Sequence, residues 1–251
     1  MKKKPTRTPR RPAGKTLARG LSAALDGARR SAAEPDIPED IRDAVSRLKR
    51  ERIIATAVQL FYGNGFNNTT LEAVADAMNV TKPFIYSHFR SKNELLAEIC
   101  SRGIRASLEA LQKAVSLQGT PTEKLESMAR DFMHAVLANQ AHIAIYNREE
   151  KHLSPSDRDA INGLRREFDR KFTALLDEGV AAGEFNVDDV QLASLAIGGI
   201  VSWSYVWYRP SGRLSQAETA DRIATLVLQM VGAKTPRRKR NNAQATAAPA
   251  H

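Results

Sequence analysis

The side chains that most often perform catalysis or bind metal ions are sparse and widely spaced in this chain of 251 residues. His134, His142 and His152 are eight and ten residues apart, whereas helical metal ligands are about three or four residues apart. The single cysteine, Cys100, excludes an internal disulfide and a zinc site built on several thiolates, and we expect a small buried apolar residue there. The sequence contains no glycine-rich phosphate loop and no Gly-x-Ser-x-Gly motif. It therefore predicts that the chain is not an enzyme, and it indicates no metal site and no cofactor.

A run of polar and charged residues follows directly on the apolar stretch 143–146, namely Asn147, Arg148, Glu149, Glu150 and His152, and Arg165 and Arg166 come later in the chain. A buried charge needs a partner. One interpretation is an internal ion pair of Arg148 with Glu149 or Glu150. The alternative is that an arginine binds an anionic ligand.

Positive charge is concentrated at the two ends of the chain. The formal net charge is +10, from 38 basic and 28 acidic residues. Residues 1–50 carry a net +8, residues 232–251 a net +5, and the stretch between them a net −3. Basic tails attract polyanions, of which nucleic acid is the commonest, although tails of this kind can also serve only solubility. We expect a disordered basic arm over residues 1–43 and a disordered basic tail over residues 233–251.

The apolar residues between these ends recur at helical spacing, and no alternating strand pattern or internal repeat is present. Six pairs of a capping residue and an acid three positions later predict helix starts: Thr69 with Glu72, Ser91 with Glu94, Thr120 with Glu123, Ser154 with Asp157, Asn186 with Asp189, and Ser215 with Glu218. The prediction is an all-α protein of about nine helices, over residues 44–63, 70–77, 81–88, 92–116, 121–138, 140–151, 155–182, 187–208 and 215–231.

No segment has the length and composition expected of a membrane span or a secretory signal. The longest apolar run, 192–203, is shorter than the ~18 residues that a span needs, and it contains Ser194 and Ser202. The arginine-rich residues 1–33 leave a transit peptide open on composition alone. We therefore expect no association with a membrane.

Two short helices at 70–77 and 81–88, joined by a tight turn, match a helix-turn-helix. Asn79 occupies the turn position where a positive φ is expected, which asparagine tolerates better than most residues. Gly63 and Gly65 are expected to end the preceding helix. The second helix of such a motif presents its N-terminal residues to the major groove of DNA.

Residues 52–96 resemble the DNA-binding domain of the TetR/AcrR family of repressors. The resemblance is carried by Arg52-Ile53, Ala55-Thr56-Ala57, Leu60-Phe61, Gly65-Phe66, Thr69-Thr70, Val74-Ala75, Val80-Thr81, Ile85-Tyr86-Ser87-His88-Phe89, Ser91-Lys92 and Glu94-Leu95-Leu96. The chain departs from the family at Asn79, where glycine is usual, and at Lys82-Pro83, where small residues are common. The resemblance implies a three-helix DNA-binding domain over 47–107, with the motif at 70–89, and a helical effector-binding and dimerisation domain over 108–232.

Carried over by position, the family's phosphate contacts fall on Thr70, Tyr86, His88 and Lys92. The residues that would face base edges are Thr81, Lys82, Pro83 and Phe84. These side chains suit the roles, because hydroxyl, imidazole and ammonium groups bind phosphate oxygens and a lysine can donate to guanine. Structural roles are the alternatives: Thr69 as a cap, Ile85 and Phe89 as core, and Pro83 as a first-turn residue.

The helix predicted at 187–208 is apolar nearly all round, so every side of it must be covered. The resemblance implies a homodimer, and the predicted interface residues are Leu192, Leu195, Ile200, Ile223 and Val227. Gly198 and Gly199 lower helix propensity, which a close approach of helices would offset. The alternative is that both helices are ordinary core.

The segment 203–215 resembles one branch of the family, which contains repressors of lipid and steroid catabolism that respond to acyl-CoA thioesters. This resemblance implies an effector pocket among the C-terminal helices. The residues predicted to contact the effector are Phe132, Tyr146, Arg148, Phe172, Trp203 and Trp207. The alternative is that the apolar residues among them pack in the hydrophobic core, as such residues more often do, and contact no effector.

These observations predict a homodimeric, one-component transcriptional repressor that binds a palindromic operator and is released by a small molecule, with an acyl-CoA thioester or another amphipathic anion as the candidate. Its partners would be double-stranded DNA, a second copy of itself and the effector, in the bacterial cytoplasm. Two alternatives stay open. One is a structural DNA-binding protein that uses its basic tails without an effector, and the other is a helical binding protein that retains the motif without using it.

Overall fold

The computed structural model describes residues 39–233, so most of the predicted arm and tail lies outside the described residues. Two units divide the chain between Lys49 and Arg50, and the residues that carry the candidate site lie in the second. The first described helix, α2, spans Glu39–Asn64. The helix starts at Glu39, inside the arm that was predicted to extend to residue 43. Glu39 and Asp40 in its first turn favour a helix N-terminus.

The described residues are all-α, as predicted, and contain no strand. After α2 the helices are α3 (Leu71–Met78), α4 (Lys82–Tyr86), α5 (Lys92–Val115), α6 (Pro121–Ala138), α7 (Gln140–Glu149), the 3-10 helix η1 (Glu150–His152), α8 (Pro155–Ala181), α9 (Val190–Ser202), α10 (Ser204–Trp207) and α11 (Gln216–Met230). The helix predicted over 187–208 is divided at Trp203 into α9 and α10.

Local capping chemistry explains most of these boundaries. The hydroxyls of Ser91, Thr120, Ser154 and Ser215 accept backbone N–H groups three residues later, as the sequence predicted. Two predicted caps are wrong. The hydroxyl of Thr70, not Thr69, accepts the Ala73 N–H and caps α3, whereas Asp189, not Asn186, caps α9. Thr69 is buried instead, where its hydroxyl donates to the carbonyl of Gly65 at 2.9 Å.

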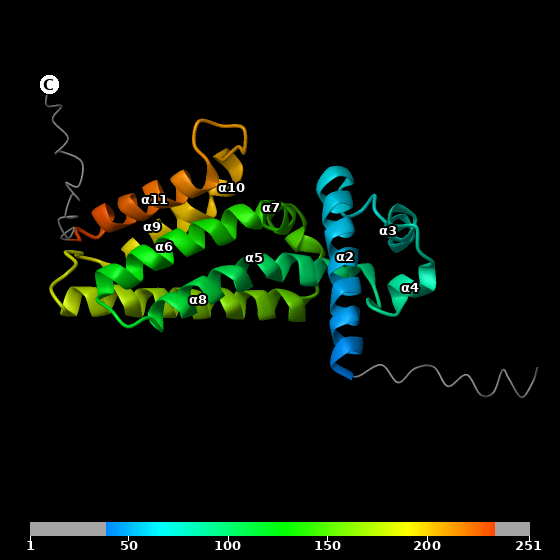
Figure 1. The fold of residues 1–251 in the computed structure, drawn as a ribbon, viewed down its shortest axis with the longest axis horizontal. Helices are drawn as coiled ribbons and strands as arrows, with labels where there is room; N and C mark the ends of the chain where they lie inside the picture. Colours follow the sequence, from blue (N-terminus) through cyan, green and yellow to red (C-terminus); the bar gives the residue numbers. More distant parts are fainter. Residues whose placement is uncertain (1–38, 234–251) are drawn as a thin grey trace, which may run out of the picture. The chain divides into compact units, whose positions relative to one another are not determined.

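Helices α3 and α4 form the predicted helix-turn-helix (Figure 1). Asn79 between them has φ 54° and ψ 46°, the left-handed conformation expected from the sequence. Its N–H and that of Val80 donate to carbonyls at the end of α3, which closes the turn. Gly65 likewise has a positive φ and follows the last residue of α2, whereas Gly63, expected to share this role, lies inside the helix.

Two groups of buried side chains hold the second unit together. In the first, Ile53 and Phe61 of α2 pack with Ile85 and Phe89 around the motif, and this group also contains Tyr146 of α7. The second lies among α5, α6, α8, α9 and α11, which run beside one another in Figure 1. The predicted boundary at 107–108 falls inside α5, so α5 and α7 both connect the motif with the C-terminal helices.

By length and composition, Val190–Trp207 could cross a membrane, which the sequence analysis did not expect. A single stretch of this kind is weak support for a span, because core helices of soluble proteins pass the same test. Only 22% of this stretch is buried: Ile197 and Val201 lie in the C-terminal core, whereas side chains such as Leu192 and Trp203 are exposed.

Candidate DNA-reading surface and effector cavity

Helix α4 presents one polar face to solvent and buries the other. Thr81, Lys82, Pro83 and Tyr86 are exposed, whereas Ile85 is fully buried against α2 and α3. Pro83 lies in the first turn, where its missing N–H costs nothing. The residues predicted to face base edges therefore lie on the accessible side of the reading helix, with Phe84 half-buried beside them.

The four residues predicted to contact phosphate lie around α4. Thr70 and Tyr86 are exposed, while His88 and Lys92 are half-buried. The Lys92 ammonium donates to the carbonyl oxygens of Phe66 and Thr69 at 2.8 and 2.9 Å. These bonds occupy two of its three donors and leave one for a phosphate oxygen. Lys92 thus also fixes the loop between α2 and α3, which the sequence pattern did not reveal.

Arg50 is a second positioning residue that the sequence analysis missed. Its guanidinium donates to the His88 carbonyl at 2.7 Å and lies 4.0 Å from the centre of the Phe89 ring. It therefore holds the segment that follows α4. Nothing local in the sequence relates position 50 to position 88, so only the tertiary structure reveals this contact.

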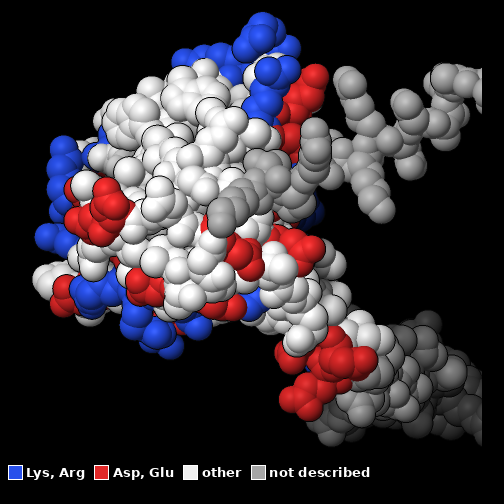
Figure 2. All heavy atoms as spheres, turned by 90° about the vertical axis from the view of Figure 1, so that its left-hand side faces the viewer, with Lys and Arg blue, Asp and Glu red and all other residues white. Residues whose placement is uncertain are grey.

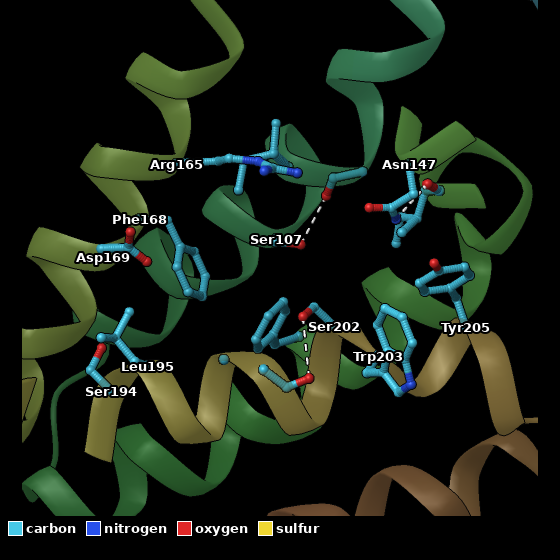
Figure 3. A pocket seen from close by; sticks show the side chains of 16 residues that line it. Ser107, Asn147, Arg165, Phe168, Asp169, Ser194, Leu195, Ser202, Trp203 and Tyr205 are labelled. Carbon is cyan, nitrogen blue, oxygen red and sulfur yellow. Dashed lines mark hydrogen bonds between the residues drawn. The ribbon is translucent and has the colours of Figure 1, made fainter. Parts of the chain in front are cut away.

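A cavity of about 380 Å³ lies among α5, α6, α7, α8 and α9 (Figure 3). This volume falls within the range of pockets that hold small organic ligands. Its lining residues are Gly103, Ile104, Ser107, Phe132, Ile143, Asn147, Arg165, Phe168, Asp169, Ser194, Leu195, Gly198, Gly199, Ser202, Trp203 and Tyr205. Those on the floor, such as Phe132, Phe168 and Ser194, are buried. Those at the rim, such as Leu195 and Trp203, are exposed.

The charged groups of the cavity come from α8, one helical turn apart. Arg165 extends from α8 toward the middle of the cavity in Figure 3, and its guanidinium lies 4.2 Å from the centre of the Tyr146 ring. Among residues 39–233, no carboxylate lies within ion-pair distance of it. Desolvation raises the pKa of Asp169, an effect that the charge of Arg165 partly opposes. The cavity thus combines apolar rings such as Phe132 and Phe168 with polar side chains such as Ser107 and Asn147, and with an arginine that has no carboxylate partner among the described residues.

The structure brings together only some of the residues predicted to contact an effector. Phe132 and Trp203 line the cavity, and Tyr146 lies beneath Arg165. Phe172 is fully buried in the core and does not line it. Trp207 lies on α10 and lines a different, smaller cavity.

Arg148 is used elsewhere, in the internal ion pair that the sequence suggested. Its Nε donates to Glu149 Oε1 at 2.9 Å, and its two terminal nitrogens donate to the carbonyls of Phe61 and Tyr62 at the end of α2. Glu149 is buried and also accepts the Phe66 N–H at 3.3 Å. This cluster therefore joins α7 to the end of α2, directly beside the cavity residue Asn147.

The histidines and the cysteine do not gather into a metal site in the described part of the chain. No three His, Cys, Asp or Glu side chains among residues 39–233 converge as metal ligands would. Cys100 is buried, as expected, and desolvation raises the pKa of its thiol to about 12, so it is unreactive near neutral pH.

Comparisons with known proteins agree with this geometry. Residues 53–99 match the family described as bacterial regulatory proteins, tetR family, and residues 118–231 match the tetracyclin repressor-like C-terminal domain. The HTH-type transcriptional repressor KstR2 of Rhodococcus jostii is 30% identical over 183 residues, which cover 72% of this chain and 89% of that protein. The chain belongs to the TetR family. Its relatives are transcriptional regulators rather than enzymes.

Solved structures of this family have the same fold. The regulator PfmR from Thermus thermophilus superposes with a TM-score of 0.65 at 30% identity, over 71% of this chain and 97% of that one. AibR, solved with isovaleryl coenzyme A and operator DNA, superposes with a TM-score of 0.62 over 74% of this chain and 99% of that one. At 23% identity, the AibR likeness shows the fold alone.

The C-terminal domain of this TetR-family protein exposes an apolar surface on α9, α10 and α11. Leu192, Leu195 and Ile200 are exposed, as expected of interface residues. Ile223 and Val227, predicted for the same interface, are instead buried, because that side of α11 packs on α6 within the core. The exposed apolar residues of α11 are Leu226 and Met230. In the end view of Figure 2, residues other than Lys, Arg, Asp and Glu cover much of the surface.

Proposed function

We propose that the protein is a one-component transcriptional repressor that binds a palindromic operator as a homodimer. The observation that carries the proposal is the exposed polar face of α4, with Lys82 and Tyr86, in a helix-turn-helix of the TetR family. A recognition helix of this kind reads base edges, and the phosphate-binding residues around it set its register. Its relatives, the KstR2 proteins, are repressors.

The exposed apolar surface of α9–α11 supports the homodimer. Leu192, Leu195, Trp203, Leu226 and Met230 expose between 42% and 62% of their surface, and apolar patches of this kind usually mark interfaces. Gly198 and Gly199, which the sequence suggested for a close approach of helices, line the cavity, and an added methyl group would meet no atom within 4 Å there. A two-fold dimer pairs with a palindromic operator, because each subunit presents one reading helix.

The proposed effector is an amphipathic anion, of which an acyl-CoA thioester is the leading candidate. The buried rings of Phe132 and Phe168 suit an acyl group, and Arg165, which has no carboxylate partner among the described residues, suits a negative charge. At about 380 Å³ the cavity suits the acyl part, and the larger nucleotide part would lie outside its rim. AibR, which shares this fold, has been solved with isovaleryl coenzyme A.

The effector would act through α7. Ile143 and Asn147 line the cavity, and the next two residues, Arg148 and Glu149, hold the end of α2. A ligand that prefers one position of α7 would shift the position of the helix-turn-helix formed by α3 and α4. Because such a ligand acts only by binding two states differently, DNA should weaken ligand binding by the same factor as the ligand weakens DNA binding.

The test of DNA reading is selection from a random duplex library at physiological salt. The full chain and a chain that lacks residues 1–38 and 234–251 should both select the same palindromic sequence. Tyr86→Ala should weaken binding to it, whereas Tyr62→Ala, which removes an exposed tyrosine of α2, should not. If selectivity disappears with the terminal segments, the protein is a charge-driven DNA-binding protein. If Tyr86→Ala and Lys92→Ala change nothing, the motif is not used.

The test of the effector compares acyl-CoA thioesters of several chain lengths with the free acids and with coenzyme A. Release of the selected duplex would be followed by fluorescence anisotropy and binding by calorimetry. Arg165→Met should weaken binding of the active compound about tenfold, because a hydrogen bond to a charged group contributes at least ~1.4 kcal/mol. Arg166→Met, which changes the neighbouring arginine outside the cavity, is the matched control. Equal effects of the two variants would contradict the assignment of Arg165.

A further inference from the structure

Lys82, the first residue of helix α4, is paired with another residue of the same chain. The Lys82 ammonium forms a salt bridge with the carboxylate of Glu72, which lies in the first turn of α3. The same ammonium lies 5.7 Å from the centre of the Tyr86 ring, within the range of a cation–π contact. Both charged side chains are about half exposed. The pair lowers the pKa of Glu72 and raises that of Lys82.

Glu72 therefore places a negative charge where DNA phosphate is expected. It lies two residues after Thr70, whose hydroxyl caps α3 and is predicted to contact phosphate. The N-terminus of a helix favours any anion, either a carboxylate of the protein or a phosphate of the ligand. Lys82, which the resemblance places at a base edge, also lies beside the predicted phosphate-contact residue Tyr86, and its charge is paired with that of Glu72 there.

We propose that Glu72 is an internal competitor of DNA phosphate, which holds Lys82 in the free protein and must release it before the reading helix engages DNA. The inference rests on the proposed DNA-reading function. Its consequence is weaker binding to all DNA, because the competition acts on the phosphate contacts, which are common to every sequence.

The experiment compares Glu72→Gln with Asp76→Asn in the full-length protein. Asp76 is an exposed carboxylate on the same helix, and it forms no salt bridge with Lys82, so its variant measures the effect of net charge alone. Affinity is measured at several salt concentrations for the duplex that the wild type selects from a random library and for an unrelated duplex of equal length. Both substitutions are at accessible positions, and circular dichroism confirms that the variants fold.

Glu72→Gln should bind both duplexes more tightly than the wild type, by up to about fivefold per subunit, the upper range for an exposed ion pair. The slope of log affinity against log salt should steepen by up to ~0.9 per subunit, since Lys82 now releases a counterion at a phosphate. Asp76→Asn should give a smaller change in both quantities. In a Lys82→Ala background, Glu72→Gln should lose most of its effect.

Three outcomes would overturn the proposal. Glu72→Gln could match Asp76→Asn, it could act equally with and without Lys82, or it could lose its preference for the selected duplex without any gain on the unrelated one. The last result would mean that Glu72 positions Lys82 for a base. Failure of the DNA-reading function would be seen separately, as a wild type that selects no sequence, and Glu72→Gln should still strengthen binding to the unrelated duplex.

Discussion

Replacement of Arg148 by methionine tests the cluster that joins α7 to the end of α2. The substitution keeps the apolar stem and removes the guanidinium, which donates to Glu149 and to the carbonyls of Phe61 and Tyr62. These carbonyls lie at the end of α2, where that of Phe61 also accepts the Gly65 N–H at 3.0 Å. Loss of the guanidinium should therefore weaken the contact between α7 and the end of α2, which precedes the helix-turn-helix.

The expected destabilisation is about 3 kcal/mol. Hydrogen bonds to a charged group contribute ~1.5–3 kcal/mol each when they are buried, but Arg148 is 48% exposed, so its two carbonyl contacts together contribute no more than ~1 kcal/mol. The larger part comes from Glu149, whose side chain is only 8% exposed and which loses its cation. Removing one partner of a buried ion pair costs up to ~3–5 kcal/mol because the other charge is left uncompensated.

The double variant Arg148→Met/Glu149→Gln should be more stable than Arg148→Met alone. A neutral glutamine oxygen can still accept the Phe66 N–H and leaves no buried charge. We expect a coupling free energy of at least ~1 kcal/mol between the two positions. Urea unfolding followed by far-ultraviolet circular dichroism, at one fixed protein concentration because a dimer would otherwise shift the midpoint, measures these values.

The matched control is Arg130→Met. Arg130 also contacts two acidic groups, Glu126 at 2.9 Å and Asp221 at 2.6 Å, but both carboxylates are largely exposed. Exposed pairs contribute ~0–1 kcal/mol, so this variant should change stability little. Equal losses at Arg148 and Arg130, or additive effects at Arg148 and Glu149, would refute the reasoning that a buried carboxylate makes the cluster strong.

Three further predictions follow from particular positions. Gly179→Ala should destabilise the protein by ~1–3 kcal/mol in urea unfolding, because the new methyl group would lie 2.0 Å from ring atoms of Phe185 and would displace that buried ring. Asp169→Asn should be slightly more stable than the wild type at pH 7, but not below about pH 3.5. Burial raises the native pKa of Asp169, so the wild type loses stability as the pH rises through the unfolded pKa of ~3.9, whereas the asparagine variant does not. Equal dependence of the two unfolding free energies on pH would contradict this. Leu226→Glu should raise the dissociation constant of the dimer in sedimentation velocity, whereas an unchanged dimer would place the interface elsewhere.

The sequence by itself determined the helices of this protein and most of their ends. Side chains such as Thr120 and Ser215 cap helices through hydrogen bonds that span three residues, so the local sequence is enough to predict where these helices begin. The same holds for the left-handed Asn79. Local rules failed where neighbours compete. Thr69 and Thr70 are both good caps, and burial of Thr69 against α2 and the loop after it decides between them.

Only the tertiary structure decided which side of each apolar helix faces outward and which charges meet. The pattern of α11 contains Ile223, Leu226, Val227 and Met230, and packing on α6 buries Ile223 and Val227 while it leaves the other two exposed. The two carbonyls that Arg148 contacts on α2 lie more than 80 residues away in sequence. Contacts at such separations depend on how helices pack rather than on the residues beside them. The cavity with Arg165 and the pairing of Lys82 with Glu72 therefore become visible only once the chain is folded.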